Sequence, residues 1–161
     1  MKKIITILVL CFMPICLFAQ TYKMYQTRNY HNQLRLNTAT GEVLQVQDDG
    51  QSWKICDAME DGGETDNRFC LYETQNMWTF IMLDTFTGKN WQVQYDTKTL
   101  DNLLCVSINE EVLEAGDESI FTIQPMTSMY QYYLISNKSG VMWQFQWTTE
   151  GSAYRWIKRV N

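Results

Sequence analysis

Beyond residue 20 the chain consists of short segments with the apolar and polar pattern of β-strands. Trp78–Asp84 is rich in β-forming residues, and apolar and polar residues alternate over Asn90–Tyr95. Such alternation places successive side chains on opposite faces of a strand. This part of the chain has no helical period of useful length, and the whole chain has only two prolines. The pattern therefore predicts an all-β protein.

One pattern occurs three times along the chain, at Tyr22–Gln47, Phe69–Gln94 and Phe121–Gln146. The second copy aligns with the first without a gap at a shift of 47 residues, and the third aligns with the second at a shift of 52. Fixed-period self-similarity is typical of repeat architectures. The coinciding positions are Gly41, Gly88 and Gly140; Leu36, Leu83 and Ile135; Leu44, Trp91 and Trp143; and the pairs Gln45/Gln47, Gln92/Gln94 and Gln144/Gln146.

Each copy contains three expected strands, and a fourth follows at Ser52–Cys56, Leu103–Ile108 and Arg155–Val160. Between the second and third strands, an Asp or Asn that caps local amides and a Gly that supplies positive φ favour a hairpin, as in Asp84–Gly88. We predict one domain over residues 20–161, with repeats at about 21–66, 67–118 and 119–161. Twelve strands in three equivalent units predict a β-trefoil. A small propeller-like barrel is the alternative, because four-stranded meanders also form propeller blades.

Two resemblances accompany this pattern. The string Leu-Asp-Thr-x-Thr-Gly-x-x-Trp at Leu83–Trp91 resembles the blade motif of quinoprotein-type propellers over nine residues. The longer pattern ending in Trp-Gln-Val-Gln at Gln94 resembles that of uncharacterised small exported bacterial proteins, over nearly all of the chain after residue 20. This second resemblance implies export and a threefold repeat, and it implies no activity.

The first 20 residues have the composition of a targeting segment. Lys2 and Lys3 precede the apolar stretch Ile4–Leu17, which is about 14 residues long and too short for a comfortable membrane span. Ala19 is a small residue at a plausible cleavage point. We expect a signal peptide at 1–19 and export to the periplasm, cell envelope or exterior of a Gram-negative bacterium, with an uncleaved anchor as the alternative. No later apolar stretch approaches 18 residues, so no membrane span is expected after cleavage.

Export would leave Cys56, Cys70 and Cys105 in an oxidising compartment. One interpretation is a Cys56–Cys70 disulfide with Cys105 free. The other is that Cys70 and Cys105 are buried thiols that pack as small hydrophobic groups, and we favour it for at least one of them. The chain contains no Cys-x-x-Cys, which excludes redox and zinc motifs of that spacing.

Charge and motifs exclude several classes of function. Removal of Lys2 and Lys3 would leave 11 of 13 basic residues against 18 acidic ones, a formal charge of about −7, which argues against nucleic-acid binding. His31 is the only histidine, and no nucleophile-elbow, P-loop or dinucleotide motif occurs, so no cofactor is expected. The acidic stretch 57–66 has oxygen ligands for Ca²⁺ but lacks the EF-hand spacing, and a solvated loop is the favoured interpretation.

The second strand of each copy has one face that is apolar in all three, formed by Leu34/Leu36, Ile81/Leu83 and Tyr133/Ile135, and we expect it to be core. The opposite face differs between copies, which fits a binding surface as well as unequal packing. The Gln rows suit solvent, a side-chain ladder or sugar hydroxyls. The candidate ligand-binding residues are Trp78, Phe80, Tyr130, Tyr132, Gln92, Gln94, Gln144 and Gln146.

These observations favour an exported, non-catalytic binding or interaction module that recognises a glycan or an envelope protein. The first alternative is a purely structural cell-envelope protein in which every aromatic residue is used for packing. The second is a glycan-active enzyme that uses two carboxylates brought together by the fold.

Overall fold

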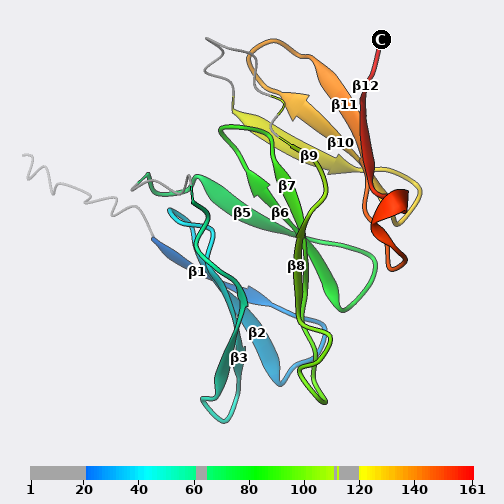
Figure 1. Ribbon diagram of the computed structural model, residues 1–161. Helices are drawn as coiled ribbons and strands as arrows, with labels where there is room; N and C mark the ends of the chain where they lie inside the picture. Colours follow the sequence, from blue (N-terminus) through cyan, green and yellow to red (C-terminus); the bar gives the residue numbers. More distant parts are fainter. Residues whose placement is uncertain (1–20, 61–64, 111, 113–119) are drawn as a thin grey trace, which may run out of the picture.

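The computed structural model describes residues 21–60, 65–110, 112 and 120–161, which form three four-stranded antiparallel sheets (Figure 1). Sheet A contains β1 (Tyr22–Gln26), β2 (Asn32–Asn37), β3 (Val43–Gln47) and β4 (Ser52–Cys56). Sheet B contains β5 (Phe69–Glu73), β6 (Thr79–Asp84), β7 (Asn90–Gln94) and β8 (Leu104–Ser107). Sheet C contains β9 (Phe121–Pro125), β10 (Gln131–Ser136), β11 (Met142–Gln146) and β12 (Trp156–Arg159), with the 3-10 helix η1 (Ser152–Tyr154) before β12.

The predicted all-β class and the three four-stranded repeats are confirmed. In every sheet the spatial order of the strands follows the chain, and the threefold repeat is consistent with the trefoil-like expectation. The described strands pair only within their own repeat and close no common barrel, so each sheet also has the strand order of a propeller blade. The expected signal peptide at 1–19 lies outside the described residues.

The turn between the second and third strands follows the expected chemistry. In sheet B, Asp84 Oδ1 accepts a hydrogen bond from the Phe86 amide at 2.9 Å, and the Gly88 amide donates to Asp84 O at 2.9 Å. Gly88 has a φ of 73°, a conformation that glycine adopts without steric cost. The carbonyl of Thr85, the residue after Asp84, accepts a hydrogen bond from the amide of Phe121 at the start of sheet C. The hairpin turn therefore also positions the following sheet.

The three sheets stack face to face in the order A, B, C (Figure 1). Leu34 and Leu36 of β2 pack against the Phe80 and Met82 side of β6 in one core. The second core lies between the other face of sheet B and sheet C. Both faces of β6 are covered, and every one of its side chains is therefore buried.

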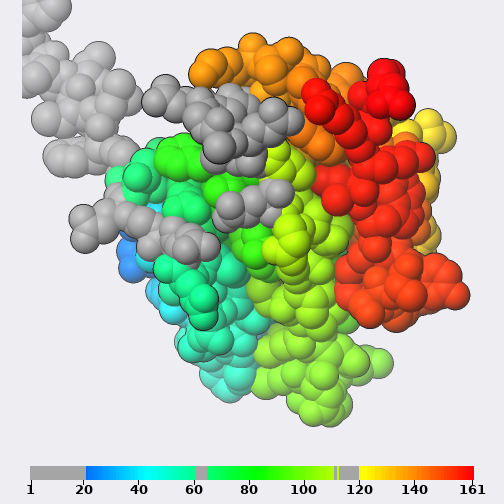
Figure 2. All heavy atoms as spheres, turned by 45° about the horizontal axis from the view of Figure 1, so that its top comes forward, coloured from blue at the N-terminus to red at the C-terminus, as the bar shows by residue number. Residues whose placement is uncertain are grey.

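The predicted core face is right in the first two repeats and wrong in the third. Tyr133 and Ile135 are only half-buried, whereas Tyr132 and Leu134 contribute to the core between sheets B and C. The reason is positional, because among the described residues sheet C is the last of the stack and has a neighbouring sheet on one side only. Figure 2 shows the blue and cyan segments of sheet A and the red segments of sheet C on opposite sides of the green sheet B.

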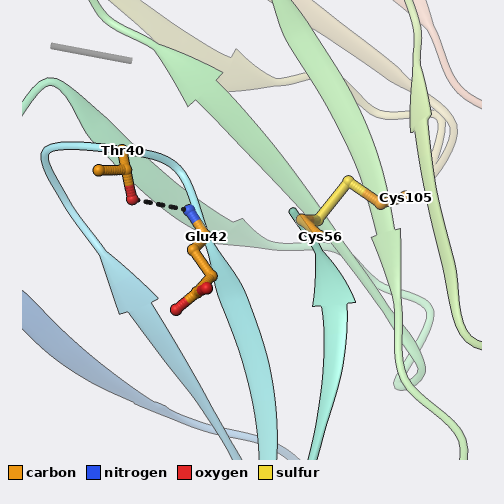
Figure 3. The surroundings of a disulfide bond; sticks show 4 residues. All are labelled: Thr40, Glu42, Cys56 and Cys105. Atoms are coloured by element: carbon orange, nitrogen blue, oxygen red, sulfur yellow. Dashed lines mark hydrogen bonds between the residues drawn. A yellow bond between two sulfur atoms is a disulfide. The ribbon is translucent and has the colours of Figure 1, made fainter. Parts of the chain in front are cut away.

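The disulfide joins Cys56 to Cys105, with 5.3 Å between their Cα atoms, and it links the end of β4 to β8 (Figure 3). The interpretation with a Cys56–Cys70 disulfide is therefore wrong, and so is a free Cys105 thiol, which both interpretations of the sequence contained. Stacking brings the fourth strands of sheets A and B together, whereas Cys70 pairs with Leu83 on β6 and lies with it on the face of sheet B that is turned toward sheet C. Cys70 is a free, half-buried thiol, as expected for one of the three cysteines.

Candidate functional site

Each repeat has one corner where the residue directly before the second strand meets the residue directly after the third strand. In sheet B the Tyr95 amide donates to Trp78 O at 3.1 Å, and the same backbone bond occurs in the other two sheets. The side chains at these equivalent positions differ: His31 Nδ1 lies 2.5 Å from Asp48 Oδ2, while the ring centroids are 5.4 Å apart in Trp78–Tyr95 and 5.0 Å apart in Tyr130–Trp147. One backbone geometry thus presents a polar His–Asp pair in sheet A and aromatic Trp–Tyr pairs in sheets B and C.

The corner of sheet B contains a surface pocket of about 240 Å³. Its lining includes Trp78, Gln94, Tyr95, Asp96, Lys98 and Asn102. The pocket beside His31 and Asp48 in sheet A is smaller, at about 110 Å³. The sheet B pocket, called the Trp78 pocket below, combines the aromatic side chains of Trp78 and Tyr95 with amide, carboxylate and ammonium groups.

The position of Trp78 is set by the turn that precedes β6. The Trp78 amide donates to Asn76 Oδ1 at 2.8 Å, and Thr74 Oγ1 donates to Asn76 O at 2.9 Å. These are the local bonds by which Asn and Thr stabilise turns. The indole packs against Tyr95, which is buried, and remains half-exposed itself. The turn at Asn76 and the Tyr95 ring therefore hold Trp78 in place, and the exposed part of its indole faces the pocket.

The other wall is the loop between β7 and β8, which is organised by Asp96. Its carboxylate accepts hydrogen bonds from the Lys98 amide at 3.1 Å, from Thr99 Oγ1 at 3.3 Å and from Asn102 Nδ2 at 3.0 Å. Burial alone would raise the pKa of Asp96, but these hydrogen bonds together lower the pKa below its usual value. Asp96 is thus an ionised anchor of the loop, and most of its hydrogen-bonding capacity is already used.

Gln94 connects the sheet to this loop, because its Nε2 donates to Asn102 O at 3.1 Å. The equivalent Gln146 donates to Tyr154 O at the same distance in sheet C. Leu100, inside the loop of sheet B, has a φ of 64°, which is costly for a residue other than glycine. The loop therefore keeps an unfavourable backbone conformation, and side-chain bonds from Gln94 and Asp96 support it.

The structure brings two of the eight predicted site residues together, Trp78 and Gln94, in the Trp78 pocket. Phe80 and Tyr132 are 2% and 3% exposed and belong to the two cores between the sheets. Gln92 is buried and accepts a hydrogen bond from Arg155 Nε at 3.4 Å.

The remaining three lie in sheet C. Tyr130 is half-buried against Trp147. Gln144 and Gln146 form a side-chain ladder through Gln131 on the face of sheet C that points away from sheet B: Gln144 Nε2 donates to Gln131 Oε1 at 3.1 Å, and Gln131 Nε2 donates to Gln146 Oε1 at 2.9 Å. The ladder is one of the roles that the sequence suggested for the Gln rows.

Sequence reasoning missed Asp96, Lys98 and Asn102 as pocket residues. They belong to a loop that is absent at this length from the first repeat, so the alignment of repeats gave no reason to single them out. A local signal did exist, because Asp96-Thr-Lys-Thr has the Asp and Thr residues that cap loop amides.

Among the described residues, no three His, Cys, Asp or Glu side chains lie close enough together to hold a metal ion. Residues 61–64 of the acidic stretch considered for Ca²⁺ lie outside the described part of the chain. The described residues also contain no helix that is long and apolar enough to cross a membrane.

Comparison with protein-family models, with curated proteins and with solved structures gives no match for this chain. The resemblance to small exported bacterial proteins therefore stays a prediction, and the function is argued from the site alone.

Proposed function

We propose that the protein is an exported, non-catalytic binding module and that the Trp78 pocket binds a neutral glycan. The observation that carries the proposal is the half-exposed Trp78 indole beside Gln94, Lys98 and Asn102 in one pocket. An aromatic face gives a surface for the apolar C–H side of a sugar ring, while amide and ammonium groups suit its hydroxyls. Binding pockets typically combine such an apolar surface with a few fixed polar groups.

The size of the pocket limits the ligand. At about 240 Å³ it is smaller than the roughly 300–1,000 Å³ clefts that enclose drug-sized molecules. One sugar ring or one end of a chain fits this space better than a whole oligosaccharide. The pocket also lies at the end of the sheet, on a loop that side chains keep in place, so the ligand would meet a preformed site.

The proposal of a non-catalytic role rests on the state of the carboxylate. Asp96 is the acidic residue of the pocket, and its oxygens accept hydrogen bonds from Lys98, Thr99 and Asn102. A general acid or base needs a free oxygen and a pKa near the working pH, whereas this pKa is lowered. Asp96 therefore suits a structural role better than proton transfer.

The proposed export has one supporting feature, which is the Cys56–Cys105 disulfide. Structural disulfides form and persist in the periplasm and outside the cell, and they are rare in the cytosol. The bond agrees with the signal peptide expected at 1–19.

The test is isothermal titration calorimetry of the purified protein with a panel of soluble neutral oligosaccharides and polysaccharides. Saturable binding to one sugar is expected, with loss of that binding in Trp78→Ala. Lys98→Ala removes an exposed side chain of the same pocket and should weaken binding without affecting folding. Trp156→Ala removes another half-exposed indole, in sheet C, and should leave the affinity unchanged.

Two results would contradict the proposal. One is the absence of saturable heat with every sugar while circular dichroism shows a folded protein. The other is full affinity in a folded Trp78→Ala variant, which would place the glycan elsewhere on the surface.

A further inference from the structure

The two ends of the sheet stack have faces that belong to a repeated interface. The side of sheet A that carries Leu34 and Leu36 packs on sheet B, and the equivalent side of sheet B, with Ile81 and Leu83, packs on sheet C. The described chain has no sheet beyond C and none before A, so one copy of each side is left open. These surfaces, called the C end face and the A end face, are equivalent to surfaces that are buried inside the stack.

The C end face carries the residues that elsewhere contact the next sheet. Its Tyr133 and Ile135 are equivalent to Leu34 and Leu36 of sheet A and to Ile81 and Leu83 of sheet B, all four of which are fully buried. In sheet C these two side chains remain half-exposed, beside Met142 and Trp156. The apolar side chains that contact the next sheet in sheets A and B are therefore partly exposed to solvent in sheet C.

Polar residues at the equivalent positions of sheets A and B form hydrogen bonds to the following sheet. Gln45 Nε2 of sheet A donates to Asp96 O in the following sheet at 2.6 Å, and Gln92 of sheet B accepts from Arg155 of the following sheet. Tyr25 accepts a hydrogen bond from the Leu71 amide of the following sheet at 3.3 Å. The residues at these positions in sheet C are Gln144 and Gln124, and the described part of the chain provides no following sheet for them.

The A end face is the matching surface. Tyr22 and Met24 are 50% and 49% exposed, whereas their equivalents Phe69 and Leu71 in sheet B, and Phe121 and Ile123 in sheet C, are buried. Leu44 and Val46 extend the apolar part of this face. Gln33 and Arg35 replace Phe80 and Met82, so the face is more polar than the internal ones, and Arg35 lies over the Tyr22 ring.

We propose that a second copy of this chain stacks head to tail, with its A end face on the C end face of the first copy. The contact continues the interface that already joins A to B and B to C, which is why a second copy is the occupant that fits. Such an interface is heterologous, so two copies either close on each other or extend into longer assemblies. The proposal is independent of glycan binding at the Trp78 pocket.

The charges predict how the contact responds to salt. Arg35 lies on the A end face and Lys158 on the C end face, so cations oppose each other across the contact, while Lys54 on the A end face is paired with Asp57. Salt screens such repulsion. Self-association should therefore become stronger with rising ionic strength, whereas association through opposite charges would become weaker.

The experiment is sedimentation equilibrium of the purified protein at concentrations up to about 1 mM. The wild-type chain should show a mass above that of one copy. Met24→Glu on the A end face and Ile135→Glu on the C end face should each shift the mass to one copy. Phe86→Glu, at an exposed apolar residue in the turn of the middle sheet, is the control and should associate like the wild type. Circular dichroism checks that each variant is folded.

Mixing the two variants tests the head-to-tail geometry. Met24→Glu keeps an intact C end face and Ile135→Glu keeps an intact A end face, so an equimolar mixture should regain the mass of two copies. A wild-type protein that stays at the mass of one copy throughout would overturn the proposal. So would a mixture that stays at the mass of one copy, because an interface between like faces cannot be restored in this way.

Discussion

Gln45 and Asp96 are joined by two hydrogen bonds that cross from sheet A to the loop after β7 in sheet B. Gln45 Nε2 donates to Asp96 O at 2.6 Å, and Gln45 Oε1 accepts from the Asp96 amide at 3.2 Å. Nε2 also donates to Asn32 Oδ1 at 2.7 Å, and the Gln45 side chain is fully buried. One amide thus satisfies backbone groups of the loop that forms the Trp78 pocket.

Replacement of Gln45 by alanine should lower the free energy of unfolding by about 2–3 kcal/mol. The substitution leaves buried donors and acceptors of Asp96 and Asn32 without partners, and each unsatisfied group costs about 1–3 kcal/mol. The measurement is urea unfolding followed by circular dichroism, with the midpoint and slope compared to wild type.

Gln144→Ala is the matched control, since Gln144 is the equivalent residue in sheet C. Its side chain is half-exposed and bonds to Gln131 on the C end face, so its loss should cost less than about 0.5 kcal/mol in a dilute sample. Equal effects at the two positions would mean that the crossing hydrogen bonds contribute no more to stability than an exposed ladder does.

The repeat alignment is what made the fold predictable. Gly41, Gly88 and Gly140 coincide because each hairpin needs the same positive-φ residue, and alternation then determined which residues share a strand face. Alternation does not say which face a neighbour covers. In the third repeat the buried pair is Tyr132 and Leu134, because sheet C ends the stack, and this depends on the order of sheets in space.

The candidate site was predictable only in part, for a related reason. Trp78 and Gln94 are inside repeated segments and could be compared with their equivalents, whereas Asp96 and Lys98 come from a loop between two strands. The disulfide gave the same difficulty. Cys56 and Cys105 are brought together by stacking of sheets, which the spacing of cysteines along the chain does not reveal.

Removal of the disulfide by Cys56→Ser with Cys105→Ser should destabilise the protein by about 4 kcal/mol. The bond closes a loop with a sequence separation of 49 residues, and the chain-entropy estimate for such a loop has this size. Thermal unfolding in the absence of reductant measures the difference. Cys70→Ser is the control, because the free Cys70 thiol closes no loop. A larger loss from Cys70→Ser than from the double variant would show that packing, rather than the cross-link, dominates.

Arg68→Met should destabilise the protein by about 3–5 kcal/mol, because it leaves the Asp84 carboxylate as a buried charge without its partner. Arg68 Nη2 lies 2.6 Å from Asp84 Oδ2, and both side chains are largely buried. Urea unfolding measures the loss.

Adding Asp84→Asn to Arg68→Met should restore part of the stability. An Asn can form the same turn, since Asn37 at the equivalent position of sheet A accepts from the Ala39 amide at 3.0 Å. A double variant that is less stable than Arg68→Met alone would show that the negative charge of Asp84 is needed by the turn itself.

Alkaline pH should destabilise the fold through its buried phenols. Burial, and next the neighbouring Cys70, raise the pKa of Tyr72, and burial also raises the pKa of Tyr25. The unfolded chain loses these protons near pH 10 while the folded one keeps them, so their stabilising contribution is complete below about pH 10 and decreases above it. Each phenol contributes a slope of up to about 1.4 kcal/mol per pH unit. Urea midpoints between about pH 8 and about pH 11 should fall less steeply in Tyr72→Phe. Tyr30→Phe, at a side chain that is 81% exposed, should keep the wild-type slope, and the same slope in all three proteins would contradict the prediction.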